Sequence, residues 1–208
     1  IKSSTGVSGK NNVQVFLIFE SDKLHKDYKL LDKGLGGLLS DSMKRNECKG
    51  GVGECTVSYG ADGVVYVLLG LGKEDKFDAG AVRTAGGSLV KKMYGMGVKK
   101  VVVNGNSGVS GKLDDEVFGR ALGEGLGIAA FNFDDFKQST KKDVTTKVLT
   151  AASSNKVLVK GLKFGLKLAE STNMARRLAA TPPNVATTMY VAGEAVKLAK
   201  GSGGTVKC

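Results

Sequence analysis

Short apolar runs rich in β-branched residues recur along the chain, and each has the length of a β-strand. The runs lie at residues 13–19, 54–59, 63–71, 98–104 and 144–150. Valine, isoleucine and aromatic residues favour strands over helices. The pattern therefore predicts five strands, with residues 60–63 forming a turn between the second and the third.

Apolar residues at helical spacing follow two aspartates, and aspartate is a preferred N-cap of helices. Asp78 precedes the first of these stretches and Asp114 precedes the second. We expect Gly95 or Gly97 to end the first helix. The predicted inner faces are Val82, Ala85, Leu89 and Met93 in the first helix, and Val117, Ala121, Leu122 and Leu126 in the second.

A long third helix is predicted to start at Ser154 as its N-cap and to run toward Leu178. Residues 181–184 (TPPN) should stop it, because proline cannot continue a helix and biases the preceding residue toward extended geometry. Thr187 or Thr188 is the expected cap of a fourth helix that closes at Gly201. Its predicted apolar side consists of Val191, Ala195 and Leu198.

Residues 204–208 read as the beginning of one more strand, which stops at the last residue. No helix follows that strand, so the sequence reads as cut rather than completed. Strands that alternate with helices indicate an α/β fold layered around a mixed sheet. No apolar run approaches the roughly 20 residues that a membrane-spanning helix needs, which predicts no membrane partner.

Positive charge gathers toward the end of the chain. The net charge is +11, and residues 151–208 carry nine basic and two acidic side chains, a net +7. Much of this comes from one group, here called the lysine seam: Lys156, Lys160, Lys163 and Lys167. On a helix these four fall within about 60° of one another. The other residues of the segment are apolar or small, so we expect a helix buried over most of its circumference with the seam in water.

Two interpretations of the lysine seam stay open. The first is a solvated edge of a packed helix. The second is a surface that binds a polyanion such as nucleic acid. Aromatic residues make up only 6% of the chain and none alternates with the seam. The seam therefore offers few aromatic rings on which nucleic-acid bases could stack.

Cysteine and histidine are scarce, which limits the chemistry open to the chain. Cys48 and Cys55 do not have zinc-ligand spacing, and with Cys208 they make an odd number. This favours a reducing, cytoplasmic-type compartment, with a Cys48–Cys55 bridge as the alternative. His25 stands alone in a polar stretch, which favours a surface position over a catalytic one.

Three glycine-rich stretches resemble nucleotide-binding motifs without meeting their requirements. Residues 70–73 (GLGK) lack the third glycine of a dinucleotide fingerprint and read as a turn. Residues 125–130 (GLGIAA) fall late in a helical pattern rather than between a strand and a helix. Residues 105–112 (GNSGVSGK) have the wrong spacing for a phosphate loop, and Leu113 stands where Ser or Thr would bind magnesium.

Several segments, in order, resemble the leucyl (cytosol) aminopeptidase family. Residues 67–73 (VLLGLGK), followed by 82–87 (VRTAGG), are similar to a strand and helix of its N-terminal domain. Residues 120–133 (RALGEGLGIAAFNF) resemble a later helix of that domain. The strongest likeness runs from residue 169 to 200, where NMARRL, TPPN and YVA resemble the passage that joins the N-terminal and catalytic domains. Arg177 stands where the family usually has aspartate, which puts a local salt bridge there in doubt.

The resemblance implies an N-terminal, macro-domain-like α/β domain at residues 1–152. A linker helix at 153–181 and the beginning of the catalytic α/β domain at 182–208 would follow. It implies a cytoplasmic homohexameric hydrolase that releases leucine-like N-terminal residues from peptides, using two divalent metals, zinc or manganese. The family's metal-binding segments do not occur in residues 1–208, so no catalytic or metal-binding residue is assigned here. The chain would then serve assembly and shielding of the hexamer.

Two alternative functions are compatible with the same fold but include no peptidase activity. One is a DNA- or RNA-binding module that uses the lysine seam, since some relatives of the family act as DNA-binding regulators. The other is a purely structural subunit that has lost its catalytic half.

Overall fold

The computed structural model describes residues 1–4, 13–21, 24–45, 48–104, 112–133, 136 and 150–206. Among these residues the strands are β1 (Lys2–Ser4), β2 (Val13–Ile18), β3 (Cys55–Tyr59), β4 (Val65–Gly70), β5 (Lys100–Asn104) and β6 (Thr150–Ala152). The α-helices are α1 (Lys29–Gly34), α2 (Leu38–Lys44), α3 (Ala79–Gly95), α4 (Asp115–Ala129), α5 (Lys156–Ala180) and α6 (Thr188–Gly201). Short 3-10 turns lie at Lys26–Tyr28 and Glu74–Lys76.

The strands form one mixed sheet in the order β1-β6-β5-β2-β4-β3. All neighbours pair in parallel except β3, which pairs antiparallel with β4 through a hairpin. Central strand β2 places Val15 opposite Val67 on one side and opposite Val103 on the other. The predicted α/β fold with a mixed sheet flanked by helices is confirmed.

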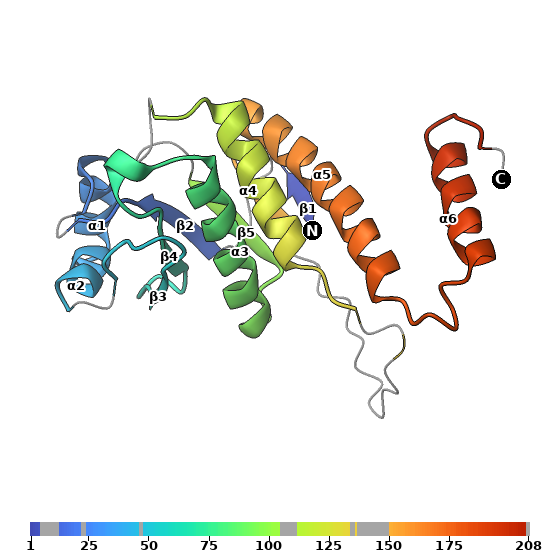
Figure 1. Cartoon of the computed structure of the whole chain (residues 1–208). Helices are drawn as coiled ribbons and strands as arrows, with labels where there is room; N and C mark the ends of the chain where they lie inside the picture. The colour runs from blue at the N-terminus through green and yellow to red at the C-terminus, as the bar shows by residue number, and fades with distance from the viewer. Residues whose placement is uncertain are drawn as a thin grey trace.

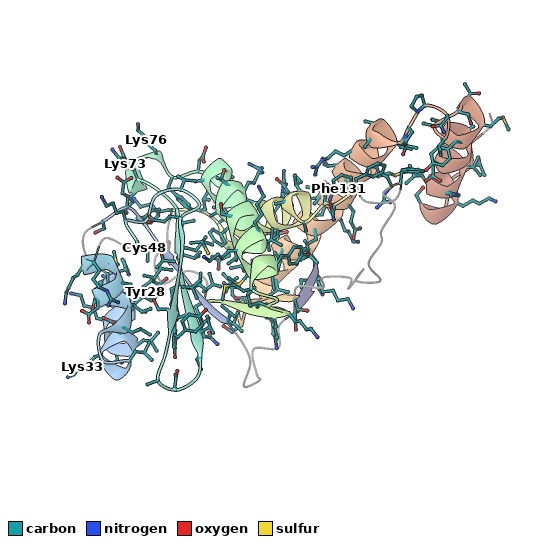
Figure 2. All side chains as sticks on the ribbon, turned by 90° about the horizontal axis from the view of Figure 1, so that it is seen from below. Tyr28, Lys33, Cys48, Lys73, Lys76 and Phe131 are labelled. Atoms are coloured by element: carbon teal, nitrogen blue, oxygen red, sulfur yellow. The ribbon has the colours of Figure 1, made fainter. Side chains whose placement is uncertain are left out.

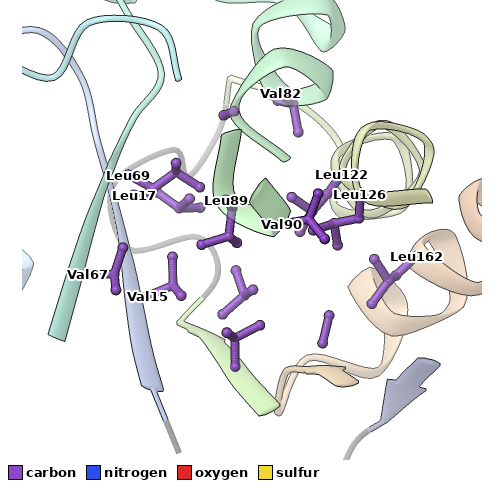
Figure 3. Close-up of a cluster of buried hydrophobic side chains, with 14 of the residues drawn as sticks. Val15, Leu17, Val67, Leu69, Val82, Leu89, Val90, Leu122, Leu126 and Leu162 are labelled. Atoms are coloured by element: carbon purple, nitrogen blue, oxygen red, sulfur yellow. The ribbon is translucent and has the colours of Figure 1, made fainter. Parts of the chain in front are cut away.

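Both faces of the sheet are covered, and side chains of β2 and β4 alternate between two cores. Helices α3, α4 and α5 cover one face, and α1 and α2 lie beside the other (Figure 1). Figure 3 shows the larger core, where Val15, Leu17, Val67 and Leu69 meet the apolar residues of the three long helices. The smaller core holds the residues of opposite parity in these strands, packed on α2: Phe16, Ile18, Tyr66, Leu68, Leu39 and Met43.

The predicted helix starts and stops are mostly confirmed. Asp78 accepts a hydrogen bond from the backbone N–H of Ala81, and Asp114 accepts from those of Glu116 and Val117. Helix α3 ends at Gly95, and Gly97 follows with a φ of +68°. Helix α5 ends before Thr181, as the proline pair predicted, and Thr187 caps α6.

Four details of the sequence interpretation were wrong. Asn155, not Ser154, caps α5, because its Oδ1 accepts from the N–H groups of Val157 at 3.0 Å and Leu158 at 3.1 Å. Val117 is 44% exposed, since Phe118 sets the phase of the buried face of α4. Residues 204–206 form no strand, while Lys207 and Cys208 lie outside the described residues.

The fourth concerns α5, which is not buried over most of its circumference. Val157 and Phe164 are 48% and 51% exposed. The helix lies at the end of the helical layer (Figure 1), so it packs on α4 and β1 and turns its remaining surface outward.

The predicted strand at 144–150 lies outside the described residues except for Thr150, where β6 begins. Helices α1 and α2 were not predicted. Asp32 explains how so short a helix as α2 forms, since its buried carboxylate accepts a hydrogen bond from the Leu39 N–H at 2.8 Å. That contact serves as a cap supplied from the preceding helix.

Cys48 and Cys55 are free thiols on opposite faces of the sheet. Cys48 belongs to the smaller core beside α2, and Cys55 packs against the larger core. Their placement argues against the bridge that the sequence left as an alternative. His25, which the sequence favoured as a surface residue, is half-buried, and its ring centroid lies 6.1 Å from that of Tyr28.

Candidate functional site

The lysine seam lies on the outer surface of α5, and all four of its side chains are exposed. Asn155 fixes where α5 begins by capping it, and its amide also donates to Asp115 at 2.6 Å. This contact ties the start of α5 to the start of α4. Lys160 forms an ion pair with Glu116 of α4 at 3.1 Å, so one member of the seam is partly neutralised.

Apolar side chains border the seam, which the sequence did not predict. Phe164 lies under the guanidinium of Arg120, at 5.8 Å from the ring centroid, and its ring is half exposed. Val157 is exposed one helical position beyond Lys156. The outer surface of α5 is therefore basic with an apolar flank.

Helices α4 and α5 approach so closely because glycines line their contact. These glycines are spaced four apart: Gly119 and Gly123 in α4, and Gly161 and Gly165 in α5. A Cβ at Gly119 would lie 2.1 Å from the carbonyl oxygen of Leu158, and one at Gly165 would lie 2.0 Å from that of Arg120. Only residues without a Cβ allow this backbone-to-backbone packing.

The GLGIAA stretch is explained by the same packing, since its two glycines face different helices. A Cβ at Gly125 would meet the Arg83 carbonyl oxygen of α3 at 2.1 Å, and one at Gly127 would meet Ala169 of α5 at 2.4 Å. Residues 125–129 of the stretch lie inside α4, as their helical pattern predicted, and Ala130 is the C-cap of that helix. The stretch serves helix packing, which also accounts for part of the high glycine content.

A buried carboxylate joins the helices of this layer. Glu124 of α4 is only 8% exposed and accepts hydrogen bonds from Arg83 of α3 and from Arg120 at 3.0 Å. Burial raises the pKa of Glu124, but the two arginines outweigh it and hold that pKa below its ordinary value. Glu124 is thus a charged structural tie and not an acid–base group poised near neutral pH.

The carboxyl ends of β2 and β4 meet at a shallow, mixed-charge depression. It is lined by Glu20, Lys73, Glu74, Asp75 and Lys112, of which Lys112 pairs with Glu74 at 3.1 Å. The GLGK stretch turns here, with Gly72 at a φ of +79°, and Figure 2 shows Lys73 and Lys76 at this end of the molecule. Residues 105–111 of the GNSGVSGK stretch lie outside the described residues.

Within the described part of the chain, no group of three or more His, Cys, Asp or Glu side chains is placed to hold a metal ion. These residues therefore do not supply a ligand set for the two metals that the resemblance implies. No described helix is both long and apolar enough to span a bilayer.

Comparison with known families and sequences gives a consistent result. The model of the cytosol aminopeptidase family, N-terminal domain, matches residues 15–140. A protein of Alkaliphilus oremlandii named "Probable cytosol aminopeptidase" is 31% identical over 195 residues, covering 89% of this chain and 39% of the relative. A protein of the same name from a Sulfurihydrogenibium species is 30% identical over 205 residues, covering 95% and 40%. The chain thus spans about two fifths of the length of these relatives.

Solved structures share the fold at lower sequence identity. A tomato leucine aminopeptidase variant gives a TM-score of 0.78 at 18% identity, over 98% of this chain and 43% of that protein. The bottromycin maturation enzyme BotP in complex with manganese gives 0.70 at 17% identity, over 92% and 37%.

Proposed function

The chain belongs to the cytosol aminopeptidase family, and from that membership we propose that it serves as the non-catalytic N-terminal part of a metal-dependent aminopeptidase. The observation that carries the proposal is the family match over residues 15–140, which is specific to the N-terminal domain. The resemblance identified from the sequence is thereby confirmed. The substrates of the whole enzyme would be peptides with leucine-like N-terminal residues.

We propose the division of the chain into residues 1–152, 153–181 and 182–208 on the same basis. Helix α5 supports it, because no residue between Glu170 and Ala180 is buried, whereas Leu158, Leu162 and Ala169 are. Helix α6 buries no residue and stands apart from the sheet (Figure 1). In this proposal α5 links the two domains and α6 opens the second.

The two metal ions, zinc or manganese, would be held beyond the residues described here. Bound metals of this kind polarise a scissile carbonyl and activate water. The manganese complex of BotP is a fold neighbour with such a metal and supports this part of the proposal. The proposal also includes assembly into a cytoplasmic homohexamer, which this domain would shield. Met189 and Leu198 of α6, 80% and 54% exposed, would be covered in that assembly.

A chimera tests the proposal directly. Residues 1–208 are joined to the remaining part of the Alkaliphilus oremlandii relative, at the point where the two sequences stop aligning. We expect hydrolysis of leucine p-nitroanilide with manganese or zinc, and a native mass of six subunits. Residues 1–208 alone should give no turnover above a metal-only blank.

Two results would count against it. Turnover by residues 1–208 alone would place chemistry in this chain. An inactive, monomeric chimera, alongside an active intact relative treated identically, would show that the domain does not serve as a family N-terminal part.

The exposed lysine seam favours a second candidate function, which is binding of nucleic acid. We propose it because Lys156, Lys160, Lys163 and Lys167 all face water from one helix. Neutralising phosphates releases counterions, so affinity for duplex DNA should fall with salt with a log–log slope of about −0.9 per phosphate contacted.

The test compares two charge reversals of equal size. Lys160→Glu with Lys163→Glu should abolish binding, while Lys29→Glu with Lys33→Glu on α1, also exposed, should leave most of it. Equal losses in both variants would point to diffuse charge attraction. Absent binding at low salt would eliminate this function.

A further inference from the structure

The carboxyl end of α4 is completed by side chains of another helix. The last carbonyl groups of an α-helix have no partner within it. Leu126 O accepts from the N–H of Ala130, in the ordinary way. The carbonyl of Gly127 accepts from Asn173 Nδ2 at 2.9 Å. That of Ile128 accepts from Arg176 Nη1 at 2.8 Å and also from the backbone N–H of Phe131 at 3.4 Å. Both side-chain donors belong to α5.

Arg176 also supplies a charge that α4 lacks. A cation stabilises the negative end of a helix dipole, yet the last turn of α4 contains no basic residue. The Arg176 guanidinium fills that role from α5, and it lies 4.3 Å from the centre of the Phe131 ring. Figure 2 shows Phe131 at the end of α4, next to α5. A cation over an aromatic face is attracted by the ring.

The two side chains act as one unit. Arg176 Nη1 also donates to Asn173 Oδ1 at 2.9 Å, so each holds the other in place. Their spacing of three residues puts them on one face of α5. We call Asn173, Arg176 and Phe131 the exit clamp.

The exit clamp lies where α5 leaves the domain. Ala169 is the last buried residue of the helix, and it packs against Gly127. Asn173 and Arg176 follow it by one and two turns, in a stretch that buries no side chain. Apolar packing therefore holds α5 up to Ala169, and polar contacts to the end of α4 hold it beyond.

We propose that Asn173 and Arg176 are positioning residues that fix the direction in which α5 leaves the domain, and hence where α6 begins. A helix held only by its buried half would pivot about the glycine contact. The clamp adds a second point of attachment further along α5, so the angle between α5 and α4 is fixed. The inference concerns the direction of α5 and stands independently of peptidase activity.

Spin-label distances in the whole chain test this inference. Nitroxides are placed at Lys91→Cys on α3 and Ala179→Cys at the end of α5, both exposed positions, in a Cys208→Ser background. A sample without the two added cysteines gives the background labelling of Cys48 and Cys55. We expect one narrow distance peak in the parent and its loss in Arg176→Ala and in Asn173→Ala.

Two further variants separate positioning from a general loss of stability. Arg176→Lys keeps the charge and one donor but not the planar contact with Phe131, so it should restore part of the narrow peak. Lys167→Ala changes another exposed cation of the same helix and should leave the peak unchanged.

Circular dichroism checks that each variant keeps its helix content. If Arg176→Ala unfolds, Asn173→Ala makes the same comparison with the parent. It removes an uncharged side chain of the same clamp. A narrow, unmoved peak in the folded Asn173→Ala and Arg176→Ala variants would overturn the inference. An inactive chimera would leave it untouched, so the two proposals fail separately.

Discussion

Arg83 of α3 donates a hydrogen bond to Glu124 of α4, and so ties together two helices that pack on the same face of the sheet. Glu124 is nearly buried, and Arg120 donates to its other oxygen from one turn earlier in α4. Both carboxylate oxygens are therefore satisfied. A buried carboxylate is tolerated only when it is paired in this way.

This arrangement predicts a loss of stability in acid. The pKa of Glu124 is lowered in the folded protein, so its contribution is fully present above the ordinary glutamate pKa. The contribution is lost as the pH falls through the lower, folded-state value. Urea unfolding curves between pH 7 and pH 3 should show this loss in the parent.

The Glu124→Gln variant should lack that part of the pH dependence and be less stable at pH 7 by about 1–3 kcal/mol. Glu116→Gln is the matched control, because the Glu116 side chain is 46% exposed and pairs with exposed Lys160. That control should change stability by less than about 1 kcal/mol. Equal effects of the two substitutions would contradict the role given to Glu124.

Glycine packing predicts a sharp dependence on position along the helices. Gly165→Ala should destabilise the domain by about 3 kcal/mol, because its Cβ would lie 2.0 Å from a backbone oxygen that cannot move alone. Gly95→Ala in α3 places its Cβ where no atom lies within 4 Å, so it should be neutral or slightly stabilising. Thermal melts of both variants measure this. A neutral Gly165→Ala would show that α4 and α5 separate easily.

Strands β2 to β5 and the aspartate-capped helices were predictable because local chemistry fixes them, whereas the short polar strand β1 (Lys2–Ser4) was not predicted. The apolar run of β2 and the aspartate caps Asp78 and Asp114 each determine their element within a few neighbouring residues. Helices α1 and α2 were not predicted because they are short, and because Leu30 and Leu31 put apolar residues on the exposed surface of α1. Their formation depends on contacts between elements, such as the hydrogen bond from the Leu39 N–H to Asp32, which no local sequence pattern reveals.

The lysine seam was predictable as a surface, since spacings of four, three and four residues place its members on one face of a helix. Its apolar flank was not, because the exposure of Phe164 depends on α5 lying at the end of the helical layer. The four-residue spacing of glycines in α4 and α5 is visible in the sequence and could have predicted their contact. The exit clamp could not be predicted, since Asn173 and Arg176 bind a helix more than forty residues earlier.

The correction at the start of α5 gives a prediction with its own control. Asn155 caps the helix and donates to Asp115, whereas Ser154 is exposed. Asn155→Ala should cost about 1–2 kcal/mol of unfolding free energy, and Ser154→Ala should cost less than about 0.5 kcal/mol. Chemical denaturation of the two variants checks this. The reverse order would restore Ser154 as the cap.

The two described cysteines should be poor nucleophiles despite being free thiols. Burial raises the pKa of Cys55 to about 11, although nearby Lys92 opposes the shift, and burial also raises the pKa of Cys48. The thiolate is the reactive form, so little of it is present at pH 8. In a Cys208→Ser variant, the folded protein should react with a thiol reagent far more slowly than the protein unfolded in urea.

Mild oxidation should also leave the Cys208→Ser variant without an internal disulfide, because Cys48 and Cys55 pack on opposite faces of the sheet. A disulfide needs Cβ atoms about 4 Å apart and facing each other. Thiol counting after oxidation and mass spectrometry of peptides distinguish the outcomes. Rapid labelling of both thiols in the native state, or a Cys48–Cys55 linked peptide, would show that the sheet opens around them, since neither reaction can occur while both cores stay packed.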